Sequence, residues 1–176
     1  GMRGVFNKSS RWRLLKADDD PDGSDFLRVR TYSHLSTGAV LTAKAYRGAA
    51  IRKCIEDFEA AIRSKSFDLV VFIGHNGLMD FDLPVPDKPE QRLPVPDCIV
   101  LCCKSEAYFK TRIEQQGGRP VLLTTQLMYP GAFILHDAAE AWMDGQSLGS
   151  IRERAGAAYS TNQKLSKKAG MGVFSR

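Results

Sequence analysis

Three short, continuous runs of apolar residues constrain the fold of this chain more than any other feature. They read "DLVVFIG" (68–74), "CIVLCC" (98–103) and "PVLLTT" (120–125), and none alternates regularly between apolar and polar residues. Strands of this composition are typical of a parallel sheet that is covered on both faces. A segment with helical character, "SEAYFKTRIEQQGG", separates the last two runs. We therefore predict an α/β fold with a mostly parallel sheet and helices on both of its faces.

The segments before the first run change from a strand pattern to a helix pattern. Residues 11–16 and 26–33 alternate in polarity around the turn-rich "ADDDPDG", which predicts an N-terminal antiparallel hairpin. We expect a further strand over 39–46 and assign it to the core that contains the parallel sheet. Over 47–64 apolar residues recur every three or four positions, which predicts a helix with Cys54 on its apolar stripe.

The remaining segments predict a loop and two C-terminal helices. Residues 80–97 are rich in proline and charge, which indicates a surface loop with room for an edge hairpin. Helices are expected over 131–144 and 150–168, the second starting at the capping box "SIRE".

The size of the chain favours one domain. A chain of 176 residues, 43% of them hydrophobic, can bury one sizeable core. We expect a single domain over 2–176, with N-terminal strands (2–38), a core (39–126) and C-terminal helices (131–169).

Composition argues against several classes of function. No apolar run approaches the roughly 20 residues that span a bilayer, and the N-terminus has no secretory pattern. We expect no membrane partner and a cytoplasmic location, provided that no targeting segment precedes the chain. The net charge of +5 is spread along the sequence, so no nucleic-acid partner is expected. No glycine-rich phosphate-binding motif is present, and no cofactor is expected.

Reduced cysteines are expected throughout. Cys98, Cys102 and Cys103 share one predicted strand, and adjacent residues of a strand point to opposite faces. This alternation, and the lack of a C-x-x-C pair, argues against a disulfide framework and against a zinc site. We expect Cys98 and Cys102 to lie in the core and no metal to be bound.

Two reactive side chains end predicted strands. His75 follows the first apolar run, and Cys103 closes the second immediately before a helix. The positive end of a helix dipole favours a thiolate, which is the form that attacks carbonyl groups. If the two strands are neighbours, His75 can serve Cys103 as a general acid and base. The backbone amides of Gly77 and Cys103 would then be placed to bind an oxyanion.

This arrangement resembles the caspase-like cysteine peptidases. In "CCKSEAYF" (102–109), Ser105 and Phe109 follow Cys103 at the spacing of the legumain-type motif. The resemblance covers about residues 39–126 and implies a three-layer sandwich, with His75 as the general acid and base and Cys103 as the nucleophile. It also implies a peptide or protein substrate. That family places glycine directly after the histidine, whereas Asn76 precedes Gly77 in this chain. The segments "GHNGLMDF" (74–81) and "CCKSEAYF" are also similar to segments of uncharacterised bacterial proteins, and this similarity implies no activity.

Several other residues are candidates for contact with a substrate. They come from the loops that follow the strands: Asn76, Asp80, Ser105, Gln126, Met128 and Tyr129. Asp80 and Asp82 are expected either to orient His75, to line a pocket for a basic side chain, or to be solvated loop carboxylates. His34, near a turn, is expected at the surface, and His136, on a helical apolar face, is expected to serve packing.

Two functions of different classes therefore remain open. One is a cysteine peptidase or amide hydrolase with a dyad of His75 and Cys103. The other is a catalytically silent domain of the same fold that binds a peptide or protein in the same place. The sequence leaves the oligomeric state undetermined.

Overall fold

The computed structural model of the chain describes residues 1–21, 25–85 and 94–175. It has a mixed α/β fold with two sheets, one antiparallel and one mainly parallel. The chain divides into two compact units, Gly1–Cys54 and Ile55–Arg176, and the division falls within helix α2. Among the described residues, no helix combines the length and the apolar character that crossing a membrane requires.

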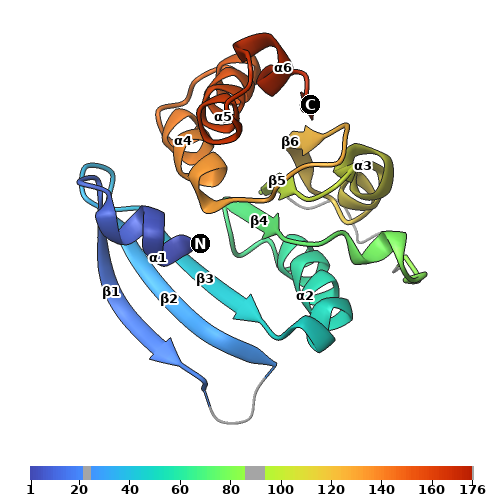
Figure 1. Cartoon of the computed structure of the whole chain (residues 1–176). Helices are drawn as coiled ribbons and strands as arrows, with labels where there is room; N and C mark the ends of the chain where they lie inside the picture. Colours follow the sequence, from blue (N-terminus) through green and yellow to red (C-terminus); the bar gives the residue numbers. More distant parts are fainter. Residues whose placement is uncertain (22–24, 86–93, 176) are drawn as a thin grey trace. The chain divides into compact units, whose positions relative to one another are not determined.

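The N-terminal unit is a three-stranded antiparallel sheet in the order β1-β2-β3 (Figure 1). Its small core contains Phe6, Trp12, Tyr32 and His34, so the expected surface position of His34 is wrong: its ring packs against Trp12 with centroids 4.9 Å apart. The elements of this unit are α1 (Met2–Val5), the 3-10 turn η1 (Phe6–Lys8), β1 (Trp12–Asp19), β2 (Phe26–His34), β3 (Val40–Tyr46) and the 3-10 turn η2 (Gly48–Ala50).

The predicted hairpin is confirmed, because β1 and β2 pair antiparallel. The assignment of 39–46 to the parallel sheet is wrong, because β3 pairs antiparallel with β2. The physical reason is the tight turn between the two strands, in which Gly38 adopts a left-handed backbone with φ of 72°. A reversal this short places the following strand directly beside the preceding one.

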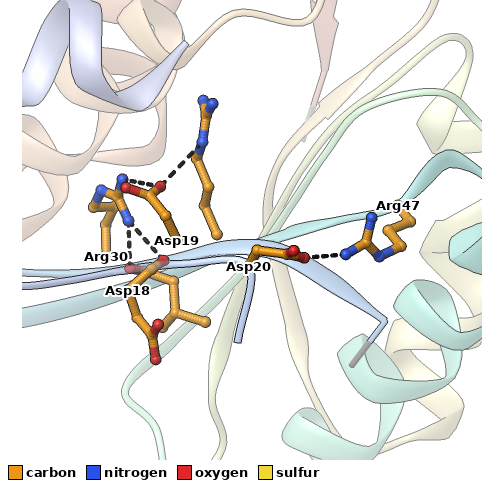
Figure 2. A network of polar contacts seen from close by, with 7 residues as sticks. Asp18, Asp19, Asp20, Arg30 and Arg47 are labelled. Carbon is orange, nitrogen blue, oxygen red and sulfur yellow. Dashed lines mark hydrogen bonds and ion pairs between the residues drawn. The ribbon is translucent and has the colours of Figure 1, made fainter. Parts of the chain in front are cut away.

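Ion pairs join the ends of the first hairpin (Figure 2). Asp19 accepts from Arg30 and lies 3.2 Å from Nε of Arg28, while Asp20 pairs with Arg47 at the end of β3. The hydrogen bond from Arg30 is the main reason that the pKa of Asp19 lies below its ordinary value. The Arg30 side chain is largely buried, but Asp19, Asp20, Arg28 and Arg47 are exposed, so each pair adds little to stability.

The second unit is built on a sheet in the order β4-β5-β6-β7. The first three strands are parallel, and the short β7 pairs antiparallel with β6. The elements of this unit are most of α2 (Ile51–Ser64), β4 (Leu69–Ile73), the 3-10 turn η3 (Gly77–Met79), β5 (Asp97–Leu101), α3 (Ser105–Gln115), β6 (Arg119–Thr124), α4 (Ala132–Met143), α5 (Leu148–Gln163), α6 (Lys167–Met171) and β7 (Phe174–Ser175).

The three apolar runs form the three parallel strands, as predicted. All five residues of β5 are buried, which explains why its sequence does not alternate. Phe72 of β4 stacks on Phe109 of α3 with ring centroids 5.5 Å apart, and Phe58 of α2 packs edge-on against both rings. Phe109 therefore contributes to the core.

The C-terminal helices differ from the prediction at one point. The helix expected over 131–144 is confirmed as α4, but the single helix expected over 150–168 is wrong. α5 ends at Gln163 because Lys164 takes a left-handed conformation with φ of 55°, and α6 follows separately. The helix is capped by Ser147, whose hydroxyl accepts from the Ser150 amide at 3.1 Å, so the predicted capping box at Ser150 is also wrong.

The proline-rich segment is described only in part. Residues 86–93, where an edge hairpin had room to form, lie outside the described residues. Over 80–85 and 94–96, the parts of this segment that the structure describes, no strand is present, which agrees with a loop.

A buried ion pair fixes the start of this loop to two helices. Arg112 of α3 donates from Nε to Glu59 of α2 at 2.6 Å, and both side chains are almost fully buried. The same guanidinium donates to the backbone carbonyls of Leu83 at 2.8 Å and Pro84 at 3.3 Å. Only a planar side chain with several donors can serve these partners together.

We expect Arg112→Met to lower the free energy of unfolding by about 3 kcal/mol or more, because it leaves the Glu59 carboxylate buried without its partner. Urea denaturation measures this change. Lys110→Met, at an exposed position of the same helix, is the matched control and should change the value by less than about 0.5 kcal/mol. Equal effects of the two substitutions would contradict the structural role of Arg112.

Candidate active site

His75 and Cys103 follow neighbouring strands at the same edge of the parallel sheet. β4 and β5 pair in register from Leu69 opposite Asp97 to Ile73 opposite Leu101. The pairing continues one step further, because the Gly74 amide donates to the Leu101 carbonyl at 3.2 Å. His75 and Cys103 each stand two residues beyond the last paired residues. The dyad requires neighbouring strands, and the strands are neighbours.

His75 is oriented by Asp80. The imidazole Nε2 and the Asp80 carboxylate form a hydrogen bond within the exposed loop that follows β4. With Nε2–H donating to the carboxylate, Nδ1 is the atom that can accept a proton. Of the alternatives for Asp80, the structure therefore shows the one that orients the histidine.

The Cys103 thiol is held by the backbone of Met128. Its Sγ lies 3.4 Å from the Met128 amide, which donates to it, and 3.6 Å from the Met128 carbonyl, to which the S–H donates. No hydrogen bond joins His75 to Cys103 in the part of the chain that the structure describes. Cys103 as a residue is half-buried.

The other two cysteines of this segment are in the core, as predicted. Cys98 and Cys102 are fully buried. Burial, with a smaller contribution from the Asp97 charge, raises the pKa of Cys98 to about 12, and burial also raises the pKa of Cys102. All four cysteines of the chain are free. Within 1–21, 25–85 and 94–175, no group of histidine, cysteine and acidic side chains is arranged to hold a metal ion.

Asn76 connects the two loops. Its side chain is fully buried and donates from Nδ2 to the Cys103 carbonyl at 2.7 Å, while Oδ1 accepts from the Leu78 amide at 3.1 Å. The prediction that Asn76 contacts a substrate is therefore wrong, because its side chain is buried and both the oxygen and the nitrogen of its amide are hydrogen-bonded within the protein. The Asn-Gly pair signals a turn in the sequence, but the bond to the other loop has no sequence signal.

Ser105 is also structural rather than a substrate contact. It is fully buried, and its hydroxyl donates to the Val100 carbonyl at 2.8 Å. Thr124 Oγ1 accepts from the Ser105 amide at 3.0 Å, and Ser105 Oγ accepts from the Thr124 amide at 2.8 Å. This exchange fixes the start of α3 to the end of β6, and so fixes the backbone on both sides of Cys103.

The remaining candidates lie on the loops of the same edge. Gln126 is exposed, and its side chain donates to the Gly172 carbonyl at 3.0 Å. Met128 is 9% exposed and meets the thiol through its backbone, whereas the Tyr129 side chain is exposed. Gly77 is buried at the start of η3, and its carbonyl accepts from the amides of Asp80 and Phe81.

Comparison with known proteins adds no assignment, since no protein-family model, no curated protein and no solved structure matches the chain.

We expect iodoacetamide at pH 8 to modify Cys103 and to leave Cys98 and Cys102 unmodified. Alkylation requires an accessible thiolate, and both buried thiols are protonated at this pH because their pKa values are raised. Peptide mass spectrometry after short exposure measures the modification at each site. In denaturant all of these cysteines should be modified. Modification of Cys98 or Cys102 in the folded protein would contradict their burial.

We expect Asn76→Ala to lower the free energy of unfolding by about 2 kcal/mol, because it leaves the Cys103 carbonyl without its donor. Urea denaturation measures the loss. The control is Asn162→Ala at an exposed position of α5, which should be nearly neutral. If Asn76→Ala were as mild as the control, the connection between the two loops would be dispensable.

Proposed function

We propose that the protein is a cysteine hydrolase that cleaves a peptide or related amide bond with a dyad of His75 and Cys103. The proposal includes a caspase-like, three-layer arrangement around the parallel sheet. The observation that supports it best is the in-register pairing of β4 with β5, which brings the ends of the two strands that precede these residues side by side at one edge.

The chemistry follows from the groups at this edge. The Cys103 sulfur attacks the substrate carbonyl carbon, and its proton passes to Nδ1 of His75. The backbone amides of Gly77 and Cys103 stabilise the oxyanion. The C–N bond then breaks as the imidazolium gives its proton to the departing amine, which leaves a thioester on Cys103.

Water completes the cycle. It attacks the thioester carbonyl while His75 takes one of its protons, and the C–S bond breaks to release the carboxylic acid and regenerate the thiol. Asp80 accepts a hydrogen bond from the imidazole throughout and stabilises its protonated form. No metal or cofactor takes part in this scheme.

The alternative is a catalytically silent domain that binds a peptide or protein at the same edge. The observation that favours it is the hydrogen bonding of the Cys103 thiol to Met128 instead of His75. In the hydrolase, a substrate bound between the two side chains would bridge them.

A panel of fluorogenic peptides with basic, acidic, asparagine or apolar residues before the reporter group tests the proposal. We expect hydrolysis of at least one peptide, and a loss of at least about 100-fold in kcat/KM for either His75→Ala or Cys103→Ala. Cys54→Ala is the matched control and should keep full activity. Cleavage that survives Cys103→Ala would disprove the dyad, and binding of peptides without cleavage would favour the silent domain.

A further inference from the structure

Two large exposed apolar side chains flank Met128, the residue whose backbone contacts the Cys103 thiol. Leu127 is 66% exposed and Tyr129 is 57% exposed, whereas Met128 between them is 9% exposed. We call Leu127 and Tyr129 the apolar rim. Its position is set by the thiol itself, because both the amide and the carbonyl of Met128 contact Sγ of Cys103.

Contacts within the protein hold Tyr129 of the rim in place. The Tyr129 amide donates to the hydroxyl of Tyr159 in α5 at 3.1 Å. The Tyr129 ring stacks on Phe133 with centroids 6.4 Å apart and planes 12° from parallel. Glycine is required at position 131 for this stacking, because a Cβ there would overlap the Phe133 ring. Such an anchored aromatic surface loses little conformational entropy when it binds.

The segment of the chain that contains the apolar rim carries no charged side chain. From Thr125 to Leu135 the chain contains no acidic or basic residue. On the loop that follows β4, the Asp80 carboxylate is bonded to His75. A charged substrate side chain placed on the rim would therefore find no oppositely charged side chain within this segment to compensate for its lost hydration.

We propose that Leu127 and Tyr129 bind a large apolar side chain of the peptide, at the residue next to the bond that Cys103 attacks. This inference rests on the proposed function and names its substrate class: peptides with leucine, phenylalanine or a similar side chain at that residue. The occupant is the substrate, because the residue between the two rim residues, Met128, contacts the sulfur of the nucleophile through its backbone. Apolar contact of this kind is typically worth a 10- to 100-fold preference.

Peptide acyloxymethyl ketones test the inference, because they alkylate a cysteine that binds their peptide part and need no hydrolysis. Four probes that differ only at the residue next to the ketone carry Phe, Leu, Lys or Asp. The second-order rate of Cys103 modification, followed by intact-protein mass, should be at least about tenfold higher for Phe and Leu than for Lys and Asp.

Two variants and a matched control sharpen the test. The double substitution Leu127→Ser with Tyr129→Ser should abolish the preference, and Leu127→Glu should shift it towards the Lys probe. The control, Tyr108→Ser with Leu165→Ser, removes two similarly exposed apolar side chains elsewhere and should keep the preference. Loss of the preference in the control as well would overturn the assignment to the rim.

The outcomes separate the rim from the dyad. Equal rates with all four probes, each slowed by His75→Ala, would overturn the rim and leave the dyad supported. A preference for Phe and Leu that His75→Ala does not slow would support the rim as a peptide-binding surface and count against the dyad. Failure of every probe to modify Cys103 would overturn both.

Discussion

The parallel, in-register pairing of β4 with β5 is the constraint on which the rest of the site depends. It carries His75 and Cys103 to equivalent positions, two residues beyond Ile73 and Leu101. Beyond the last paired residues of β4 and β5, the buried Asn76 side chain connects the two loops through its hydrogen bond to the Cys103 carbonyl. Ser105 and Thr124 fix the backbone after Cys103 to β6. Three neighbouring strands thus define one rigid edge.

The strands of the parallel sheet could be predicted because burial on both faces leaves a direct mark on composition. The runs at 68–74, 98–103 and 120–125 are apolar throughout, and each became a strand. The partner of 39–46 could not be predicted, since its small apolar side chains suit either sheet and the short turn at Gly38 decided the pairing. The break at Lys164 was equally hidden, because lysine gives no sign of a left-handed conformation.

The sequence indicated which side chains end the strands, but not what each of them contacts. His75 and Cys103 were found because a reactive residue at the carboxyl end of a parallel strand is at the edge where ligands bind. The sequence offers Asn76 and Ser105 as substrate contacts, and Ser105 also as a residue that stabilises the start of the following helix. Their burial depends on neighbours 19 to 27 residues away in the chain, which pattern analysis does not reach. The contact of Met128 with the thiol is likewise a property of packing.

The most direct test of the proposed dyad is whether His75 controls the rate of acyl transfer to Cys103. A peptide ester is mixed with the protein, the reaction is quenched with acid, and intact mass reports the thioester. We expect an adduct on Cys103 that forms and disappears in the wild type, and that forms at least about 100-fold more slowly in His75→Ala. An adduct that forms equally fast in His75→Ala, or that still forms in Cys103→Ala, would contradict the dyad.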